Sequence, residues 1–119
     1  MFNVEGTTIS LSRGDTGAIK FIADTEYEFA AEDRALFSIK NGVGEVVMES
    51  AFALDSNKAF VVTFFNSDTD SLTPTTYNWD VRYIIHPYYD DSGRIIDGDQ
   101  VITPNAPMNL NLLNVVGEV

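Results

Sequence analysis

The stretch TTYNWDVRYII, residues 75–85, carries a large apolar side chain at every second position from its third residue onward. Successive side chains of a β-strand point to opposite faces, so these alternate residues share one face of an extended chain. They are Tyr77, Trp79, Val81, Tyr83 and Ile85. The residues between them are Asn78, Asp80, Arg82 and Ile84. The stretch therefore predicts a core strand whose apolar face is buried between two layers.

Shorter segments with the same period of two lie on both sides of this stretch, separated by Gly, Asn, Asp and Pro. They cover residues 8–11, 19–23, 35–39, 45–54 and 58–65, a short run before Pro104, and a final run from about Met108. Asn41-Gly42 predicts a hairpin turn, because both residues tolerate a positive φ. We expect residues 66–76 to form one helical turn or an open loop. After His86-Pro87 we expect the pattern to break into turns, with a candidate small hairpin around Asp91-Ser92-Gly93.

Seven to eight short strands without a credible long helix predict an all-β fold, an antiparallel β-sandwich. The chain has 119 residues, of which 45% are apolar. A chain of that length and composition can enclose one hydrophobic core without disulfides. Residues 1–119 are therefore predicted to form a single domain.

The charge balance is strongly acidic and excludes some classes of partner. Eighteen acidic residues face seven basic ones, for a formal net charge of -11. Such a field repels phosphate backbones, so we expect no nucleic acid and no anionic membrane as partner. The chain has no cysteine, so disulfides, thiolate metal ligands and a cysteine nucleophile are excluded. The N-terminus lacks the pattern of a signal peptide, and we expect synthesis in the cytoplasm.

An Arg-Gly-Asp tripeptide lies in SLSRGDTG, between two alternating runs. As an adhesion motif it would have to present both charges on an exposed tip. As a turn, glycine would supply the positive φ, and Asp15 or Thr16 would bond nearby backbone. Because a tripeptide match is unspecific and its flanks alternate as paired strands, we interpret Arg13, Gly14, Asp15 and Thr16 as a structural turn.

Catalytic and metal-binding patterns are absent from the sequence. NSDTDSLTPTTY has acids at alternate positions, but Ser71 and Tyr77 occupy positions where a calcium loop needs Gly and Glu. Four acids between residues 90 and 99 could gather around a weak surface ion, but solvated loop charge is the expected state. His86 is the only histidine, and we interpret it as structural. We therefore expect no enzyme activity, no cofactor and no metal.

Tyr88 and Tyr89 follow His86-Pro87 and precede the acidic loop. Aromatic side chains on loops are typical contact anchors, and the same two residues could instead cap the end of the fold. We favour a partner contact over the structural role.

The order of SLSRGDTG, ALFSIKN and FFNSDTDSLTPTTYNWDVRY resembles the immunoglobulin-like N-terminal domain of phage and prophage baseplate upper proteins. The resemblance covers residues 8–112. The Arg/Lys-Gly-Asp-Thr turn of that family matches Arg13 to Thr16. Its Tyr-x-Tyr-Asp strand matches Tyr77 to Asp80, with Trp79 in place of the second tyrosine. The chain lacks the extension that longer members carry after position 119, which suggests a stand-alone accessory protein.

The resemblance implies a non-catalytic structural module of a phage tail, found in the virion, that contacts other baseplate proteins and forms a homo-oligomer. The competing hypothesis is a cell-surface or secreted immunoglobulin-like module that binds carbohydrate or protein through Tyr88, Tyr89 and the acidic loop. The two matched motifs also suggest that Asp80 and Arg13 are each held by the other segment or by backbone N–H groups. On that hypothesis, Asp80→Ala would lower thermal stability by more than an exposed site does.

Overall fold

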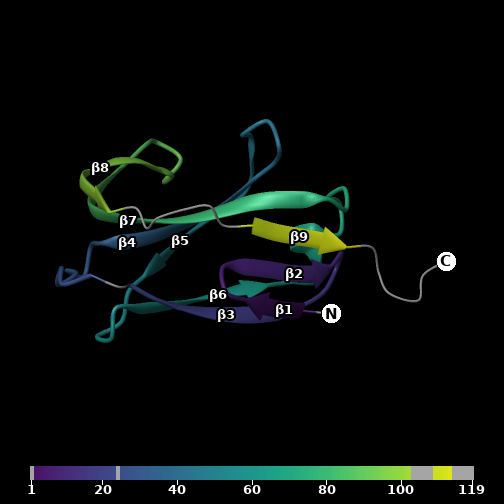
Figure 1. Ribbon diagram of the computed structural model, residues 1–119. Coiled ribbons are helices and arrows are strands. Elements are labelled where there is room, and N and C mark those ends of the chain that lie inside the picture. Colours follow the sequence, from purple (N-terminus) through teal and green to yellow (C-terminus); the bar gives the residue numbers. More distant parts are fainter. Residues whose placement is uncertain (1, 24, 103–108, 114–119) are drawn as a thin grey trace.

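The computed structural model describes residues 2–23, 25–102 and 109–113. The chain is all-β, with one short helix, and its strands form two sheets (Figure 1). The larger sheet has the order β1 (Phe2–Glu5), β2 (Thr8–Ser12), β9 (Asn109–Leu113), β7 (Thr76–Tyr89), β4 (Arg34–Lys40) and β5 (Val46–Ala53), and β8 (Ile95–Ile102) also pairs with β7. The smaller sheet consists of β3 (Gly17–Ile22) and β6 (Ala59–Phe64).

Strand pairing is antiparallel throughout the described residues, with one exception. β2 runs parallel to β9 in the register Thr8↔Asn109 to Ser12↔Leu113. β9 also pairs antiparallel with the beginning of β7, so it joins the N-terminal strands to the centre of the sheet. The described residues form nine strands, where the alternation in the sequence predicted seven to eight.

β7 extends past the expected break at His86-Pro87 and ends at Tyr89, and the turn of the expected small hairpin follows at residues 91–93. Its pairing with β8 keeps one register from Ile85↔Gln100 through Pro87↔Gly98 and shifts only between Tyr88 and Tyr89, while His86 takes a φ of 49°. The strand therefore passes His86-Pro87 without losing its register, and a bulge lies next to the hairpin turn. The proline is tolerated because β4 pairs with β7 only as far as Ile84, which leaves one side of β7 unpaired there.

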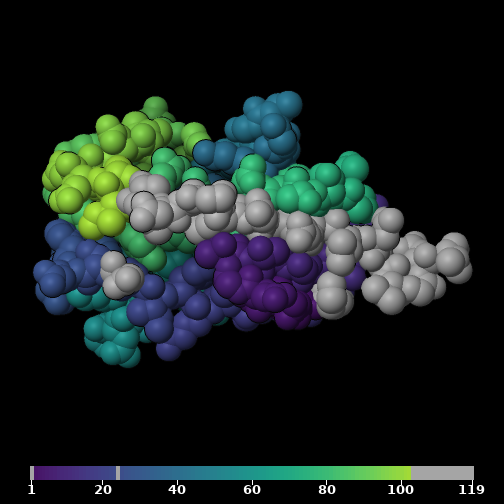
Figure 2. Space-filling view, in the orientation of Figure 1, coloured from purple at the N-terminus to yellow at the C-terminus, as the bar shows by residue number. Residues whose placement is uncertain are grey.

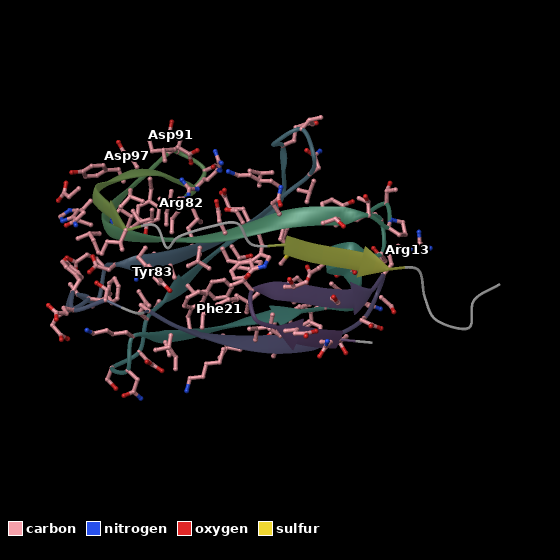
Figure 3. The ribbon with its side chains drawn as sticks, in the orientation of Figure 1. Arg13, Phe21, Arg82, Tyr83, Asp91 and Asp97 are labelled. Carbon is pink, nitrogen blue, oxygen red and sulfur yellow. The ribbon has the colours of Figure 1, made fainter. Side chains whose placement is uncertain are left out.

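The two sheets face each other across an aromatic core. The inner face of β7 contributes Tyr77, Trp79, Val81 and Tyr83, all buried. Opposite them, Phe21 of β3 stacks on Phe60 of β6 with ring centroids 5.2 Å apart. The Trp79 indole lies 5.3 Å from the ring of Phe21, and its Nε1 donates a hydrogen bond of 3.0 Å to the Thr7 carbonyl. Figure 3 shows Phe21 and Tyr83 between the two layers.

The predicted hairpin between β4 and β5 is present, but its turn differs from the expected one. The positive φ belongs to Gly44, at 86°, and not to Asn41 or Gly42. Asn41 instead holds the turn with its side chain, whose Oδ1 accepts hydrogen bonds from the N–H groups of Val43 and Glu45. Asn41 therefore stabilises the turn because its side chain accepts hydrogen bonds from backbone N–H groups, and not because it adopts a left-handed conformation.

The connection between β6 and β7 begins with one helical turn, α1 (Asn66–Thr69). Asp68 Oδ2 accepts a hydrogen bond of 2.7 Å from the Phe65 N–H, which satisfies a donor at the start of the turn. The sequence left a helical turn and an open loop as alternatives, and the chain adopts the helical turn. Among the described residues, no helix has the length and apolar character needed to cross a membrane.

Candidate functional site

Arg13 and Gly14 form a tight turn between β2 and β3, with Asp15 and Thr16 leading into β3. The Asp15 N–H donates to the Ser12 carbonyl over 2.9 Å, and Gly14 has a φ of 84°. The Ser12 N–H in turn donates to Asp15 Oδ2 over 3.0 Å. The Asp15 carboxylate is therefore engaged in its own turn, whereas an adhesion motif would present it to a receptor.

A second contact fixes this turn to the far end of β6. The Gly14 N–H donates a hydrogen bond of 2.9 Å to Oγ1 of Thr69, which lies 55 positions later in α1. Thr69 is completely buried. The partly exposed Arg-Gly-Asp segment is thus attached through a buried threonine to the connection between β6 and β7.

Replacing Thr69 with valine should lower the free energy of unfolding by about 1–2 kcal/mol, because the Gly14 N–H would lose its acceptor while the volume stays nearly the same. Chemical denaturation monitored by tryptophan fluorescence measures the change. Thr69→Ser keeps the hydroxyl and serves as the control, with less loss than valine. A valine variant as stable as the parent would show that this hydrogen bond contributes nothing.

The outer face of β7 carries Asp80, which lies opposite Ser38 of β4 in the register. Its Oδ2 is 3.8 Å from Lys40 Nζ, and its Oδ1 is buried without a hydrogen-bond partner among the described residues. Ser38 Oγ is also buried and lacks such a partner. The sequence suggested that Asp80 is held by the segment of Arg13 or by backbone N–H groups. The ion pair is made with Lys40 instead, because that residue lies on the neighbouring strand.

Asp80→Ala should therefore change the free energy of unfolding by less than about 1 kcal/mol. A long, partly exposed ion pair contributes little, and the substitution also removes a buried carboxylate oxygen that has no hydrogen-bond partner among the described residues. This outcome is smaller than the sequence suggested. Thermal and urea unfolding at neutral pH measure it, with Lys40→Ala as the matched variant. A loss above about 2 kcal/mol would mean that the carboxylate has stronger partners.

Beyond Ile85, β7 and β8 form a hairpin that we call the arm, residues 86–99. In Figure 1 the arm, in green and yellow-green, curls back above β4, β5 and β7. Its turn is closed by Asp90, whose Oδ1 accepts hydrogen bonds from the Ser92 hydroxyl and from the N–H groups of Ser92 and Arg94. The bond from the Ser92 hydroxyl holds the pKa of the Asp90 carboxyl below its usual value.

Tyr88 and Tyr89, the expected contact residues, lie on the arm with 46% and 49% of their surface exposed. Ile96 is also exposed there, at 60%. The Tyr88 hydroxyl hydrogen-bonds Asp99 across the arm, which raises the pKa of Tyr88. Tyr89 pairs with Ile95 at the far end of the hairpin. The arm therefore presents apolar and aromatic surface on a paired, hydrogen-bonded support.

The base of the arm depends on Asp33, a residue that the sequence analysis missed. Asp33 is 1% exposed, and its two oxygens accept hydrogen bonds of 2.7 Å from the Ala30 N–H and 2.9 Å from the His86 N–H. The second bond holds the His86 backbone in its left-handed conformation. The His86 ring points outward, with Nδ1 3.6 Å from Asp99 Oδ2. Asp33 thus acts as a clamp, and the one histidine has a structural position.

Glycine is required at position 98, where the arm approaches β7. A Cβ there would lie 2.5 Å from Ile84 Cγ2 and 2.8 Å from the Ile85 carbonyl oxygen. The backbone oxygen cannot move aside without disturbing β7. The close approach of β8 to β7 at this point therefore depends on the absence of a side chain at Gly98.

A pocket of about 190 Å³ lies between the arm and the outer face of the larger sheet. Leu36, Ile84 and Ile95 form a small buried cluster at its floor. Arg82 and Arg94 bring two guanidinium groups to its wall. Sequence analysis missed this pocket because its residues come from β4, β7 and β8, which only the fold brings together.

The two arginines of the pocket differ in their hydrogen bonds. Arg94 Nε donates to Glu49 Oε1 over 2.9 Å, and this bond raises the pKa of the Arg94 guanidinium. Arg82 Nε is buried and has no hydrogen-bond partner among the described residues. Asp97 also lines the pocket. Figure 3 shows Arg82, Asp97 and Asp91 at the arm end of the molecule and Arg13 at the opposite end.

The acidic segments bring no metal site together in the part of the chain that is described, where no group of three or more potential ligands converges. In comparisons with known proteins, no family model matches the chain, and no curated protein matches it. The functional assignment therefore depends on the turn, the arm and the pocket themselves.

Proposed function

We propose that the chain is a non-catalytic structural and assembly module of a phage or prophage tail, of the baseplate type, acting through protein–protein contacts. The observation that carries the contact role is the arm, which exposes Tyr88, Tyr89 and Ile96 on a paired hairpin. Aromatic residues on a rigid support lose little freedom on binding and are common anchors of interfaces. The tail assignment is supported by the resemblance of residues 8–112 to the baseplate upper protein domain.

Two features support an immunoglobulin-like β-sandwich as the finer fold. The order β2-β9-β7-β4-β5, facing the pair β3-β6, is the order expected of an immunoglobulin variable-type sandwich, with β1 added at the edge of the larger sheet. The Tyr77 hydroxyl donates a hydrogen bond of 2.8 Å to the Thr73 carbonyl just before β7 begins. A tyrosine that bonds upstream backbone at this corner is a hallmark of such sandwiches.

Virions purified from an induced lysogen that encodes the chain test the tail assignment. An antibody should detect the protein in gradient-purified particles, and immunogold labelling should place it at the end of the tail. Its absence from purified particles would contradict the proposal.

The contact role of the arm has a separate test. A double variant, Tyr88→Ser with Tyr89→Ser, should reduce incorporation into particles by at least tenfold while thermal stability stays within a few degrees of the parent. Val61, another exposed apolar residue but on the smaller sheet, provides the matched control as Val61→Ser. Equal incorporation of the double variant and the control would contradict a contact role for the arm.

A homo-oligomer is part of the proposal. Within the described residues, each strand of the smaller sheet has one unpaired edge, and such edges can pair with a second copy. Light scattering after size-exclusion chromatography should give a mass that is a multiple of 13.2 kDa. A single 13.2 kDa species at high concentration would contradict this part of the proposal.

A surface-exposed binding module for carbohydrate or protein is the second candidate, and the exposed ring of Tyr89 beside Asp90 and Asp91 favours it. An aromatic face next to carboxylates can stack on a sugar ring and accept hydrogen bonds from its hydroxyls. Titration with cell-wall polysaccharide fragments tests this candidate. Saturable binding that Tyr89→Ser abolishes would favour it over the tail module.

A further inference from the structure

The arm and the larger sheet line a pocket that has an apolar floor and charged side chains on its wall. Its floor is aliphatic, formed by Leu36, Ile84 and Ile95, which are between 2% and 7% exposed. Arg82 brings a guanidinium to the same pocket from β7. A site with an apolar floor and one convergent charged group is typical of pockets for small ligands.

Arg82 is the group in this pocket that lacks a counterpart. Its Nε is buried and has no hydrogen-bond partner among the described residues. A guanidinium donates five N–H bonds in a fixed plane, and its two terminal nitrogens can hold the two oxygens of a carboxylate even where Nε is buried. The neighbouring Arg94 is already bonded by Nε and Nη2 to the Glu49 carboxylate. Arg82 is therefore the better anchor for an added anion.

The size of the pocket suits a small anion. A space of about 190 Å³ that is open to solvent on one side takes a carboxylate on a stem of a few carbons. A second hollow of about 340 Å³ shares Leu36, Arg94 and Ile95 with the first.

We propose that this pocket binds a carboxylate on a short aliphatic stem, with the oxygens on Arg82 and the stem on Leu36, Ile84 and Ile95. The ligand is either the side chain of a glutamate in a protein segment or a free small carboxylic acid, and both present the same chemistry. Asp97 lines the pocket as a like charge and weakens the binding. This proposal is independent of whether the chain belongs to a phage tail.

Titration of the ¹⁵N-labelled protein with sodium isovalerate at constant ionic strength tests the proposal, with neutral isovaleramide as the matched probe. Amide signals of Ile84, Arg94 and Ile95 should shift saturably with the acid and should not shift with the amide. The acid and the amide binding equally would overturn the role of the charge. An acid that gives no saturable shift would overturn the site.

Substitutions then test whether Arg82 is the residue that holds the carboxylate. Arg82→Gln should weaken isovalerate binding at least tenfold, and Asp97→Asn should strengthen it two- to fivefold. Arg13→Gln removes the same charge at the opposite end of the molecule (Figure 3) and should change the affinity by less than twofold. Equal weakening by the Arg13 and Arg82 variants would show a general charge effect and overturn the assignment. Thermal melting of each variant verifies that it is folded.

Two short peptides separate the sources of the ligand. The acetylated and amidated tripeptide Leu-Glu-Leu is compared with its Leu-Gln-Leu counterpart and with free isovalerate. Tighter binding of the glutamate peptide than of the free acid assigns the pocket to a protein segment, and the reverse order assigns it to a small acid. Equal binding of the two peptides would contradict a carboxylate site.

Discussion

Asp33→Ala should lower the free energy of unfolding by about 3–5 kcal/mol, the largest effect that we expect from a single polar residue. The substitution leaves two N–H groups without acceptors, those of Ala30 and His86. Hydrogen bonds to a charged group contribute about 1.5–3 kcal/mol each, and a buried donor left unpaired adds its desolvation cost. His86 would also lose the contact that holds its φ at 49°. Urea denaturation measures the loss.

Two further variants test whether the loss of stability comes from the two hydrogen bonds that Asp33 accepts. Asp33→Asn keeps one acceptor oxygen and should lose about half as much as alanine. Asp91→Ala removes a carboxylate from an exposed position in the arm turn and should stay within about 0.5 kcal/mol of the parent. If Asp33→Ala lost less than about 1 kcal/mol, the two hydrogen bonds would not hold the arm base together.

Phe37→Ala should lower the free energy of unfolding by about 3–5 kcal/mol, as expected when a fully buried aromatic ring is removed. Phe37 has no exposed surface. Its ring lies 5.9 Å from that of Phe21, 6.0 Å from that of Phe64 and 6.0 Å from that of Trp79, so the cavity would open between the two sheets. Equilibrium unfolding in guanidinium, followed by the emission of Trp79, measures the loss.

Phe37→Leu fills much of the same space and should cost less than half as much as alanine. Phe65 is 60% exposed at the end of β6 and serves as the surface control, since Phe65→Ala should cost less than about 0.5 kcal/mol. A Phe37→Ala loss as small as that of Phe65→Ala would mean that the two sheets do not pack through this ring.

The inner face of β7 could be predicted from the sequence because period-two alternation is a local property. Tyr77, Trp79 and Val81 are buried where their spacing places them. The parallel pairing of β2 with β9 could not be predicted, because no local pattern specifies which distant strand becomes a neighbour. The turn of the arm could be placed at Asp91-Ser92-Gly93, but the length of its strands could not be predicted: His86-Pro87 has the local features of a strand end, and the pairing with β8 continues through it.

The Arg13 to Thr16 segment could be interpreted as a turn from its glycines and its alternating flanks. The flanks do not pair with each other as expected, because β2 and β3 belong to different sheets, and the contact with Thr69 could not be anticipated. The pocket could not be predicted from the sequence at all. Arg82 lies on the polar side of an alternating strand, which normally faces solvent, and the arm covers it only because β8 folds back over the sheet. Asp33 likewise has its second partner 53 positions away.

The position of β9 has a consequence for biosynthesis. Because β9 lies between β2 and β7, the larger sheet joins residue 8 to residue 109. A nascent chain on the ribosome cannot complete that sheet until residues 109–113 have been translated and have left the exit tunnel. The closure of so long a segment is also slow, and until then the edges of β2 and β7 stay open to other chains. Expression at low temperature or with a chaperone should therefore raise the soluble yield.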